Sequence, residues 1–339
     1  MVTLVAQIAP QRSTQYAALA SALAPHELRL SPIGHQMGPI QPITLGGRDF
    51  LRFDLPTEPT DEEVEELGRL AMTGAFFIYY ERLGRVTGPL LRPIETGFEP
   101  IFPELATTRR YRGKTNELFT HFMCNVARFS SGLHDRPWNT LRVFDPLAGG
   151  GTTLLTALML GAEAAGVEAN AHDVESTVAF IRQYMREQNL PCEVREERFK
   201  GIGRRWVLTL GQAQRRQCIL AQGNTQDSAR LIGGFHPHLI VADLPYGIQH
   251  KGELVELLST ALPVWASILP PGGAMVLAWE SRRLGRAEMI ELVQNSAPLT
   301  VLNDPPYDAL AHRVDRVIKE RDLIVARLSQ MVERERQAG

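Results

Sequence analysis

Short apolar runs alternate with amphipathic stretches over the second two-thirds of the chain. Runs such as Leu-Ile-Val-Ala at 239–242 are apolar at every position, which is typical of strands buried on both faces. The alternation predicts an α/β fold with a parallel sheet, helices on both faces, and a ligand site outside the carboxyl ends of the strands. The expected strands cover residues 141–144, 164–167, 218–221, 238–242, 274–278, 299–302 and 322–328.

The first hundred residues show a less regular pattern. Strand-like segments cover 48–55 and 75–81, and an acidic helical stretch opens at Thr60 with the sequence Thr-Asp-Glu-Glu-Val-Glu-Glu. Proline and glycine interrupt the chain at 33–42 and 88–103. We therefore expect a small α+β module at residues 1–106, a candidate for substrate binding, followed by a larger α/β domain at residues 107–339.

A helix is expected at the start of the larger domain. Leu118, Phe122, Val126 and Phe129 recur at helical spacing, and Thr115 stands where a capping residue is needed. The basic residues at 109–114, just before this helix, either contact the phosphates of a substrate or form a solvated linker.

Length and composition indicate a globular protein. The 339 residues fit two domains, and 44% hydrophobic with 22% charged residues allow a sizeable core. No uncharged apolar stretch is long enough to span a membrane, and the first ten residues lack the basic leader of a secretory signal. We therefore expect a soluble, cytoplasmic protein, and no oligomeric state is indicated.

Cysteine and histidine usage argues against a metal. Cys124, Cys192 and Cys218 lie far apart, so neither a disulfide framework nor a thiolate metal site is expected. His236-Pro-His238 has no further ligand at metal-binding spacing, and we expect it to form a surface turn.

The charge balance limits which partners the chain can bind through bulk electrostatics. Thirty-six lysines and arginines stand against 38 aspartates and glutamates, a net charge of −2. Proteins that bind polyanions through overall charge are usually basic, so nucleic-acid binding here needs local basic patches. Residues 195–216 combine arginines with Phe199 and Trp206, a mixture that suits either phosphates and stacked bases or a solvated hairpin.

The most informative segment is Asp145-Pro-Leu-Ala-Gly-Gly-Gly-Thr152. An expected strand ends at Asp145, and glycines then allow a tight turn that brings backbone N–H groups close to a ligand. The next strand ends in Glu168, 17 to 19 residues after the glycines, near the spacing at which a carboxylate binds ribose hydroxyls. Because the glycines are contiguous and follow Asp-Pro, the loop favours a cofactor with an amino-acid tail over a dinucleotide.

This segment resembles the Asp-Pro-x-x-Gly-x-Gly-Thr motif of class I S-adenosyl-L-methionine methyltransferases that modify amino groups of nucleic acids. An ordinary strand-to-helix turn is the alternative. Gln222-Gly-Asn224-Thr225 resembles the family segment that contacts adenine, where an aspartate is more usual, although a simple loop is an equal alternative. The resemblance implies S-adenosylmethionine as cofactor, held by Asp145, Pro146, Ala148, Gly149, Gly150, Gly151, Thr152, Glu168 and Asn224.

The segment Asp243-Leu-Pro-Tyr246 follows the fourth expected strand and resembles the (Asn/Asp)-Pro-Pro-(Tyr/Phe) motif of amino-group methyltransferases. An exocyclic base amine is a poor nucleophile, because its lone pair is delocalised into the ring. The Asp243 carboxylate and the Leu244 carbonyl can accept its N–H bonds and turn the lone pair toward the methyl group. Pro245 restricts Leu244 to an extended conformation, and Tyr246 offers a ring for stacking an unstacked base. A buried strand that ends in a proline turn is the alternative.

A second segment, Asp304-Pro-Pro-Tyr307, matches the motif more literally. It follows the sixth expected strand, whereas the catalytic loop of this fold follows the fourth. We therefore expect residues 304–307 to form a turn in the terminal hairpin, and a contribution to the active site is the alternative.

The order of the two loops and the Leu-Pro form of the second are similar to the THUMP-associated guanine-N2 methyltransferases of tRNA, over residues 107–330. This resemblance implies a Rossmann-like sheet with an antiparallel last strand, and an enzyme acting on guanine N2 in tRNA or another structured RNA. The alternatives are a DNA adenine-N6 or cytosine-N4 methyltransferase, a protein glutamine N-methyltransferase, or a cofactor-binding module without catalysis. RNA is favoured over DNA as the partner.

Overall fold

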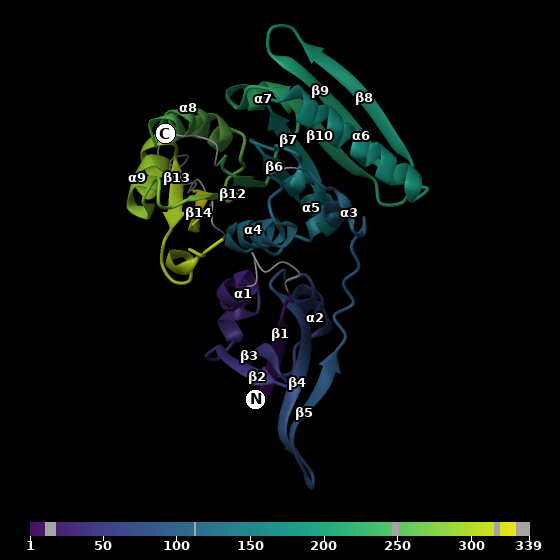
Figure 1. Ribbon diagram of the computed structural model, residues 1–339, viewed down its shortest axis with the longest axis vertical. Coiled ribbons are helices and arrows are strands. Elements are labelled where there is room, and N and C mark those ends of the chain that lie inside the picture. The colour runs from purple at the N-terminus through teal and green to yellow at the C-terminus, as the bar shows by residue number, and fades with distance from the viewer. Residues whose placement is uncertain (11–17, 112, 246–250, 315–318, 330–339) are drawn as a thin grey trace, which may run out of the picture.

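The computed structural model describes residues 1–10, 18–111, 113–245, 251–314 and 319–329. The chain forms a five-stranded sheet from its N-terminal residues and a nine-stranded sheet from the rest, with α4 (Glu117–Ser130) between them (Figure 1). No helix in the described ranges is long and apolar enough to cross a membrane.

The N-terminal sheet has the strand order β2-β3-β1-β4-β5. Apart from one 3-10 helix, the first six elements of this module follow the β-α-β-β-α-β order of ferredoxin-like folds, and β5 adds an edge strand. The elements are β1 (Val2–Ile8), α1 (Leu19–Leu30), the 3-10 helix η2 (Gly34–Gln36), β2 (Gln41–Leu45), β3 (Arg48–Leu55), α2 (Asp61–Gly68), β4 (Thr73–Leu83) and β5 (Val86–Ile94).

Local sequence signals predicted part of this module. The stretch from Thr60 is α2, which begins with a capping box in which Thr60 and Glu63 bond each other's backbone N–H groups. β3 coincides with the segment expected at 48–55, and β4 contains that at 75–81. Breaker residues concealed other elements: α1 contains Pro25, and β5 carries prolines that an edge strand tolerates.

The second sheet contains every strand that the apolar runs predicted. Its order is β13-β14-β12-β11-β6-β7-β10-β9-β8. The strands β12, β11, β6, β7 and β10 run parallel, and β14 lies antiparallel to β12 and β13. This confirms the expected Rossmann-like sheet, which is mostly parallel with an antiparallel last strand. The expected strands are β6 (Arg142–Asp145), β7 (Glu163–Glu168), β10 (Arg216–Gly223), β11 (Leu239–Asp243), β12 (Ala274–Glu280), β13 (Leu299–Leu302) and β14 (Arg321–Leu328).

Helices cover both faces of this sheet. Alternate residues of each strand enter different buried clusters, so that Val143 packs with α4, α5 and α6 whereas Phe144 packs with α7, α8 and α9. The first cluster also includes side chains of the N-terminal module, so the boundary near residue 106 stays a prediction. The remaining helices are α3 (Leu105–Thr108), η3 (Trp138–Thr140), α5 (Thr152–Leu160), α6 (Ala171–Glu187), η4 (Thr225–Asp227), α7 (Ser228–Leu231), α8 (Lys251–Ser267), α9 (Arg286–Ser296) and η5 (Tyr307–Ala309).

The basic segment at 195–216 lies mostly in a hairpin. β8 (Cys192–Phe199) and β9 (Gly203–Leu210) pair antiparallel and extend the sheet beyond β10. Trp206 is buried, and so its ring is not available to stack a base. Exposed arginines pair with glutamates of the same hairpin, for example Arg198 with Glu196. The hairpin interpretation is therefore the one that the structure supports.

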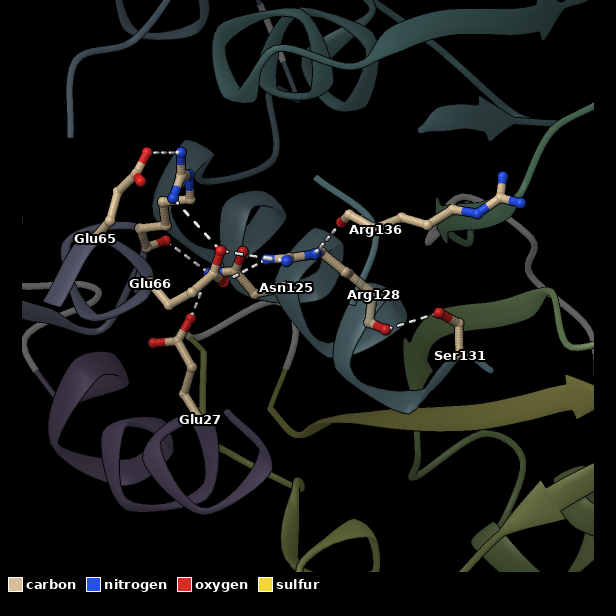
Figure 2. Close-up of polar contacts among 8 residues, drawn as sticks. Glu27, Glu65, Glu66, Asn125, Arg128, Ser131 and Arg136 are labelled. Atoms are coloured by element: carbon tan, nitrogen blue, oxygen red, sulfur yellow. Dashed lines mark hydrogen bonds and ion pairs between the residues drawn. The ribbon is translucent and has the colours of Figure 1, made fainter. Parts of the chain in front are cut away.

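A buried polar network joins the N-terminal module to α4 (Figure 2). The Glu27 carboxylate on α1 accepts hydrogen bonds from the backbone N–H groups of Ala71 and Met72 and from Asn125 Nδ2 on α4, at 2.7–2.9 Å. Burial raises the pKa of Glu27, whereas these three donors act in the opposite direction. Asn125 Nδ2 also donates to the Arg69 carbonyl, so one amide holds two segments of the module.

A second contact lies one turn further along α4. Arg128 donates to both carboxylate oxygens of Glu66 on α2, at 2.5 and 3.2 Å, and its Nε donates to the Arg136 carbonyl (Figure 2). The guanidinium is almost fully buried and the Glu66 side chain is 22% exposed. Bidentate geometry fixes the angle between the partners as well as their distance. These buried contacts therefore fix both the position and the orientation of the N-terminal module on α4.

Glu27→Ala should destabilise the protein by about 3 kcal/mol, because two buried backbone N–H groups and an amide lose their acceptor and a cavity remains. Urea denaturation measures the change. Glu65→Ala is the matched control: its side chain is 55% exposed and pairs with Arg69, so the expected cost is below about 1 kcal/mol. Equal costs for the two variants would contradict the role assigned to the buried carboxylate.

Candidate active site

The carboxyl ends of β6 and β11 lie side by side, because these strands pair in parallel with Val143 opposite Leu239 and Phe144 opposite Ile240. The loops that follow them open onto one cavity of about 510 Å³. It is lined by Tyr111, Gly113, Thr115, Asp145, Leu147, Ala148, Gly149, Gly150, Thr152, Thr153, Glu168, Asp173, Asp243, Leu244 and Pro245. The two motifs singled out from the sequence therefore face each other.

Each of the three contiguous glycines meets a different requirement. Gly149 has φ +49°, and no atom lies within 4 Å of where its Cβ would be. Gly151 has φ +85°, and a Cβ there would lie 2.8 Å from the Thr177 methyl group on α6. A Cβ on Gly150 would lie 2.3 Å from the ring of Tyr111. Gly149 and Gly151 therefore supply left-handed backbone, and Gly150 and Gly151 leave room for the side chains packed against them.

The segment before α4 covers this glycine loop. The Tyr111 hydroxyl is hydrogen-bonded to Thr152 Oγ1 at 2.5 Å. Arg109 is buried and donates to the Gly150 carbonyl at 2.8 Å, to the Ser176 carbonyl and to Thr177 Oγ1. The expectation that Arg109 contacts phosphates or lies in a solvated linker is wrong. Its guanidinium satisfies a carbonyl of the loop and ties it to α6.

Gly150→Ala should cost about 2 kcal/mol of folding free energy, because the new methyl group overlaps the Tyr111 ring. In a Tyr111→Ala background the added cost should fall below about 0.5 kcal/mol, a coupling that a double-mutant cycle in urea denaturation measures. Gly149→Ala is the control. Its cost of about 1–2 kcal/mol comes from the left-handed backbone alone and should be the same in both backgrounds. Additive effects of Gly150→Ala and Tyr111→Ala would refute the packing argument.

Carboxylates dominate the polar lining of the cavity. Asp145 is buried, and burial raises its pKa to about 7. The nearby charges of Asp243 and Glu168 add to this rise in pKa. Hydrogen bonds from Thr153 and from the Leu147 N–H act in the opposite direction. Glu168 Oε2 accepts from the Gly149 N–H at 2.9 Å, so the second-strand acid is fixed against the glycine loop. Asp173 also lines the space. Such a lining favours a ligand that carries positive charge.

Hydrogen bonds to its backbone and to its carboxylate hold the Asp243-Leu244-Pro245 segment. The Leu244 N–H donates to the Ala278 carbonyl of β12 at 2.9 Å, and the Leu244 side chain is buried. Asp243 Oδ2 accepts a hydrogen bond of 2.7 Å from Thr115 Oγ1. Pro245 is exposed at the cavity, and Tyr246 lies outside the described residues.

The predicted helix cap is wrong by one residue. Asn116 caps α4, its Oδ1 accepting from the N–H groups of Leu118 and Phe119 at 2.9 and 3.1 Å. Both residue types can cap, and the sequence pattern did not distinguish them. The correction matters, because it leaves the Thr115 hydroxyl to bind Asp243.

Three predicted site residues are not among the described residues that line the cavity. Asn224 is exposed, and its Oδ1 accepts from the Gln226 N–H at the start of η4. Pro146 is buried, and Gly151 packs on Thr177. Leu147, Thr153 and Asp173, which were not predicted, line the cavity in the same region.

The second Pro-Pro-Tyr segment lies in the connection between β13 and β14, as expected for the terminal hairpin. The Tyr307 carbonyl accepts a hydrogen bond of 2.7 Å from Arg286 Nη2. Neither Asp304 nor Tyr307 is among the described residues that line the cavity.

The expected surface turn at 236–238 is wrong for His238. This side chain is buried, and its Nδ1 accepts from the Arg142 N–H at 3.1 Å, which supports the start of β6. Burial, with Arg142 and Arg136 nearby, lowers the pKa of His238 to about 4. Within the described ranges, no group of three or more His, Cys, Asp or Glu side chains is placed to hold a metal ion.

No protein-family profile matches the sequence, and no curated protein matches it. Among solved structures, TrmN from Thermus thermophilus is similar at 15% identity and a TM-score of 0.46, covering 97% of this chain and 100% of that one. The rRNA methyltransferase aviRa from Streptomyces viridochromogenes is 15% identical with a TM-score of 0.41, covering 66% and 90%. An O-methyltransferase from Bacillus cereus in complex with SAH is 12% identical with a TM-score of 0.36, covering 64% and 84%. Likenesses this distant carry no argument for activity, and the fold class rests on the strand order itself.

Proposed function

We propose that the chain is a cytoplasmic S-adenosylmethionine-dependent N-methyltransferase acting on an exocyclic amino group of a nucleobase. One observation carries the proposal: the glycine loop after β6 and the Asp243-Leu244-Pro245 segment after β11 line the same cavity. A cofactor loop and an amine-positioning loop must meet for methyl transfer, and adjacent parallel strands bring them together.

The residues present fit S-adenosylmethionine, which supplies the methyl group. Its sulfonium and ammonium groups are cationic, and the cavity presents the carboxylates of Asp145, Glu168 and Asp173. Glu168, beside the glycine loop, is the candidate acceptor for ribose hydroxyls. The open side of Gly149 allows close approach of the methionine portion to the backbone. Ala148, Gly150 and Thr152 complete this side of the proposed cofactor site.

In the proposed mechanism the chain's own residues orient the amine. The Asp243 carboxylate and the Leu244 carbonyl accept its two N–H bonds, which directs the nitrogen lone pair into the cofactor side of the cavity. The hydrogen bond from the Leu244 N–H to Ala278 and the ring of Pro245 restrict the backbone that carries the second acceptor. No strong base is needed, because the nitrogen becomes acidic as it acquires the methyl group, and the Asp243 carboxylate that accepts its N–H can take up the released proton. Orientation then supplies most of the rate.

Guanine N2 in tRNA or another structured RNA is the proposed substrate, and Tyr246 the proposed stacking residue. The Leu-Pro form of the catalytic loop and the order of the two loops support RNA. DNA adenine N6 or cytosine N4 is the second candidate, and a protein glutamine amide is less well supported. The module at 1–106 is proposed to contribute to substrate binding.

Asp145 should make cofactor affinity depend on pH. A bound cation favours the ionised carboxylate, so the affinity for S-adenosylmethionine should rise about tenfold between about pH 6 and pH 8, as the group with a pKa of about 7 loses its proton. Asp145→Asn should abolish the part of this slope that the side chain causes. The ammonium group of the ligand titrates equally with both proteins, so calorimetric titrations of the pair isolate the carboxylate. Identical slopes would contradict its placement beside the cofactor.

Asp243→Ala should lower methyl transfer at least about a hundredfold, because the amine loses an orienting acceptor. Cofactor affinity should change less than about threefold, since the glycine loop is intact, and this measurement also shows that the variant is folded. Transfer of tritiated methyl groups to unmodified tRNA and to genomic DNA, followed by nucleoside mass spectrometry, identifies the substrate. A fully active Asp243→Ala variant, or no transfer to either nucleic acid, would refute the proposal.

A further inference from the structure

The Asp243 carboxylate is held from two sides by residues distant in sequence. Thr115 Oγ1, from the segment before α4, donates to Asp243 Oδ2 at 2.7 Å. Arg321 Nη2, from the first residue of β14, lies 3.5 Å from the same oxygen. The side chains of Arg321 and Asp243 are 3% and 9% exposed, so this ion pair is screened little by water. Neither contact was expected from the sequence.

Arg321 is itself fixed by its surroundings. Its guanidinium carbon lies 4.6 Å from the centroid of the Phe119 ring on α4, within the range of a cation–π interaction. The backbones of Arg321 and His312 exchange two hydrogen bonds of 2.8 and 2.9 Å, and the His312 ring packs against Phe119 with centroids 4.9 Å apart. The guanidinium therefore has little freedom to leave Asp243.

The charges around this carboxylate have opposing effects. Asp145 lies on the neighbouring strand β6, and its charge repels that of Asp243: burial is the main cause of the raised pKa of Asp145, and the charge of Asp243 adds to the rise. His312 contributes no positive charge at neutral pH, because burial, with Arg321 nearby, lowers its pKa to about 4. Among the described residues, the buried guanidinium of Arg321 contacts Asp243 and opposes the repulsion from Asp145.

We infer that Arg321 and Thr115 are positioning residues for methyl transfer: Arg321 keeps the Asp243 carboxylate ionised, and Thr115 sets the orientation in which it accepts the amine. The inference rests on the proposed function and deepens it. A carboxylate between a cation and a second carboxylate loses its ability to accept from the amine if it takes up a proton. The two contacts act on different properties, because Arg321 supplies charge and Thr115 supplies direction.

The test compares Arg321→Met, Thr115→Val and the conservative Thr115→Ser, using the nucleic acid found to be methylated by the wild-type protein. Both Arg321→Met and Thr115→Val should lower kcat about 10- to 100-fold, because a small displacement of the acceptor has an effect of this size. KM for the nucleic acid and affinity for S-adenosylmethionine should change less than about threefold. Thr115→Ser keeps the hydroxyl and should retain most of the wild-type kcat.

The pH profile separates the two roles. In Arg321→Met, the pH at which half of kcat is lost on the acidic side should rise by about one unit or more. The Asp243 carboxylate loses the nearby positive charge of Arg321 in this variant, while the negative charge of Asp145 remains. In Thr115→Val the plateau should fall with a smaller shift. A merely structural role would lower kcat without moving the acidic limb in Arg321→Met, and that result would overturn the inference.

Two further outcomes are decisive. If Arg321→Met does not fold, the comparison of the wild type with Thr115→Val and Thr115→Ser decides. Equal kcat values for these three proteins would overturn the inference. If Asp243→Ala is inactive while Arg321→Met and Thr115→Val are fully active, the inference fails and the proposed function stands. An active Asp243→Ala variant instead removes the proposed function, and the inference with it.

Discussion

The parallel pairing of β6 with β11 is the constraint on which the site depends. These central strands are four and five residues long, buried, and aligned so that both end at one edge of the sheet. A backbone loop of glycines follows one strand, and a loop with a carboxylate and a proline follows the other. Because the register is fixed by apolar residues packed on both faces, the separation of the two loops is set by the core rather than by the loops themselves.

Helix α4 is the second element that organises the molecule. Its N-terminal end lies beside the Asp243-Leu244-Pro245 segment, where Thr115 donates to Asp243 and the Phe119 ring packs against Arg321. Its later turns carry Asn125 and Arg128, which bind the N-terminal module through buried polar groups. Such groups are costly to leave unpaired, so they specify one docking arrangement more strongly than apolar packing alone.

The sequence was sufficient to predict the larger sheet, the glycine turn and the position of the Asp243-Leu244-Pro245 segment at the end of β11. Buried strands and glycine turns follow from local residue properties, so period and spacing identify them. Contacts between distant segments have no such local signal. Arg321 lies in a charged run that looks solvent-exposed, yet it packs against Phe119 and Asp243, about 200 and 80 residues earlier. The same limit applies to Arg109. In the sequence it is one of several neighbouring basic residues, and only the structure shows that it donates to the Gly150 carbonyl.

The seating of the N-terminal module on α4 has a consequence for selectivity. Glu27 and Glu66 bind the same helix that begins beside Asp243, so the module is fixed in position relative to the cavity. Under the proposed function, a nucleic acid that contacts both the module and the cavity must place its target nucleotide at a set distance from its contact with the module. The distance between the two contact points would then select the target nucleotide, without direct contacts to the intervening bases.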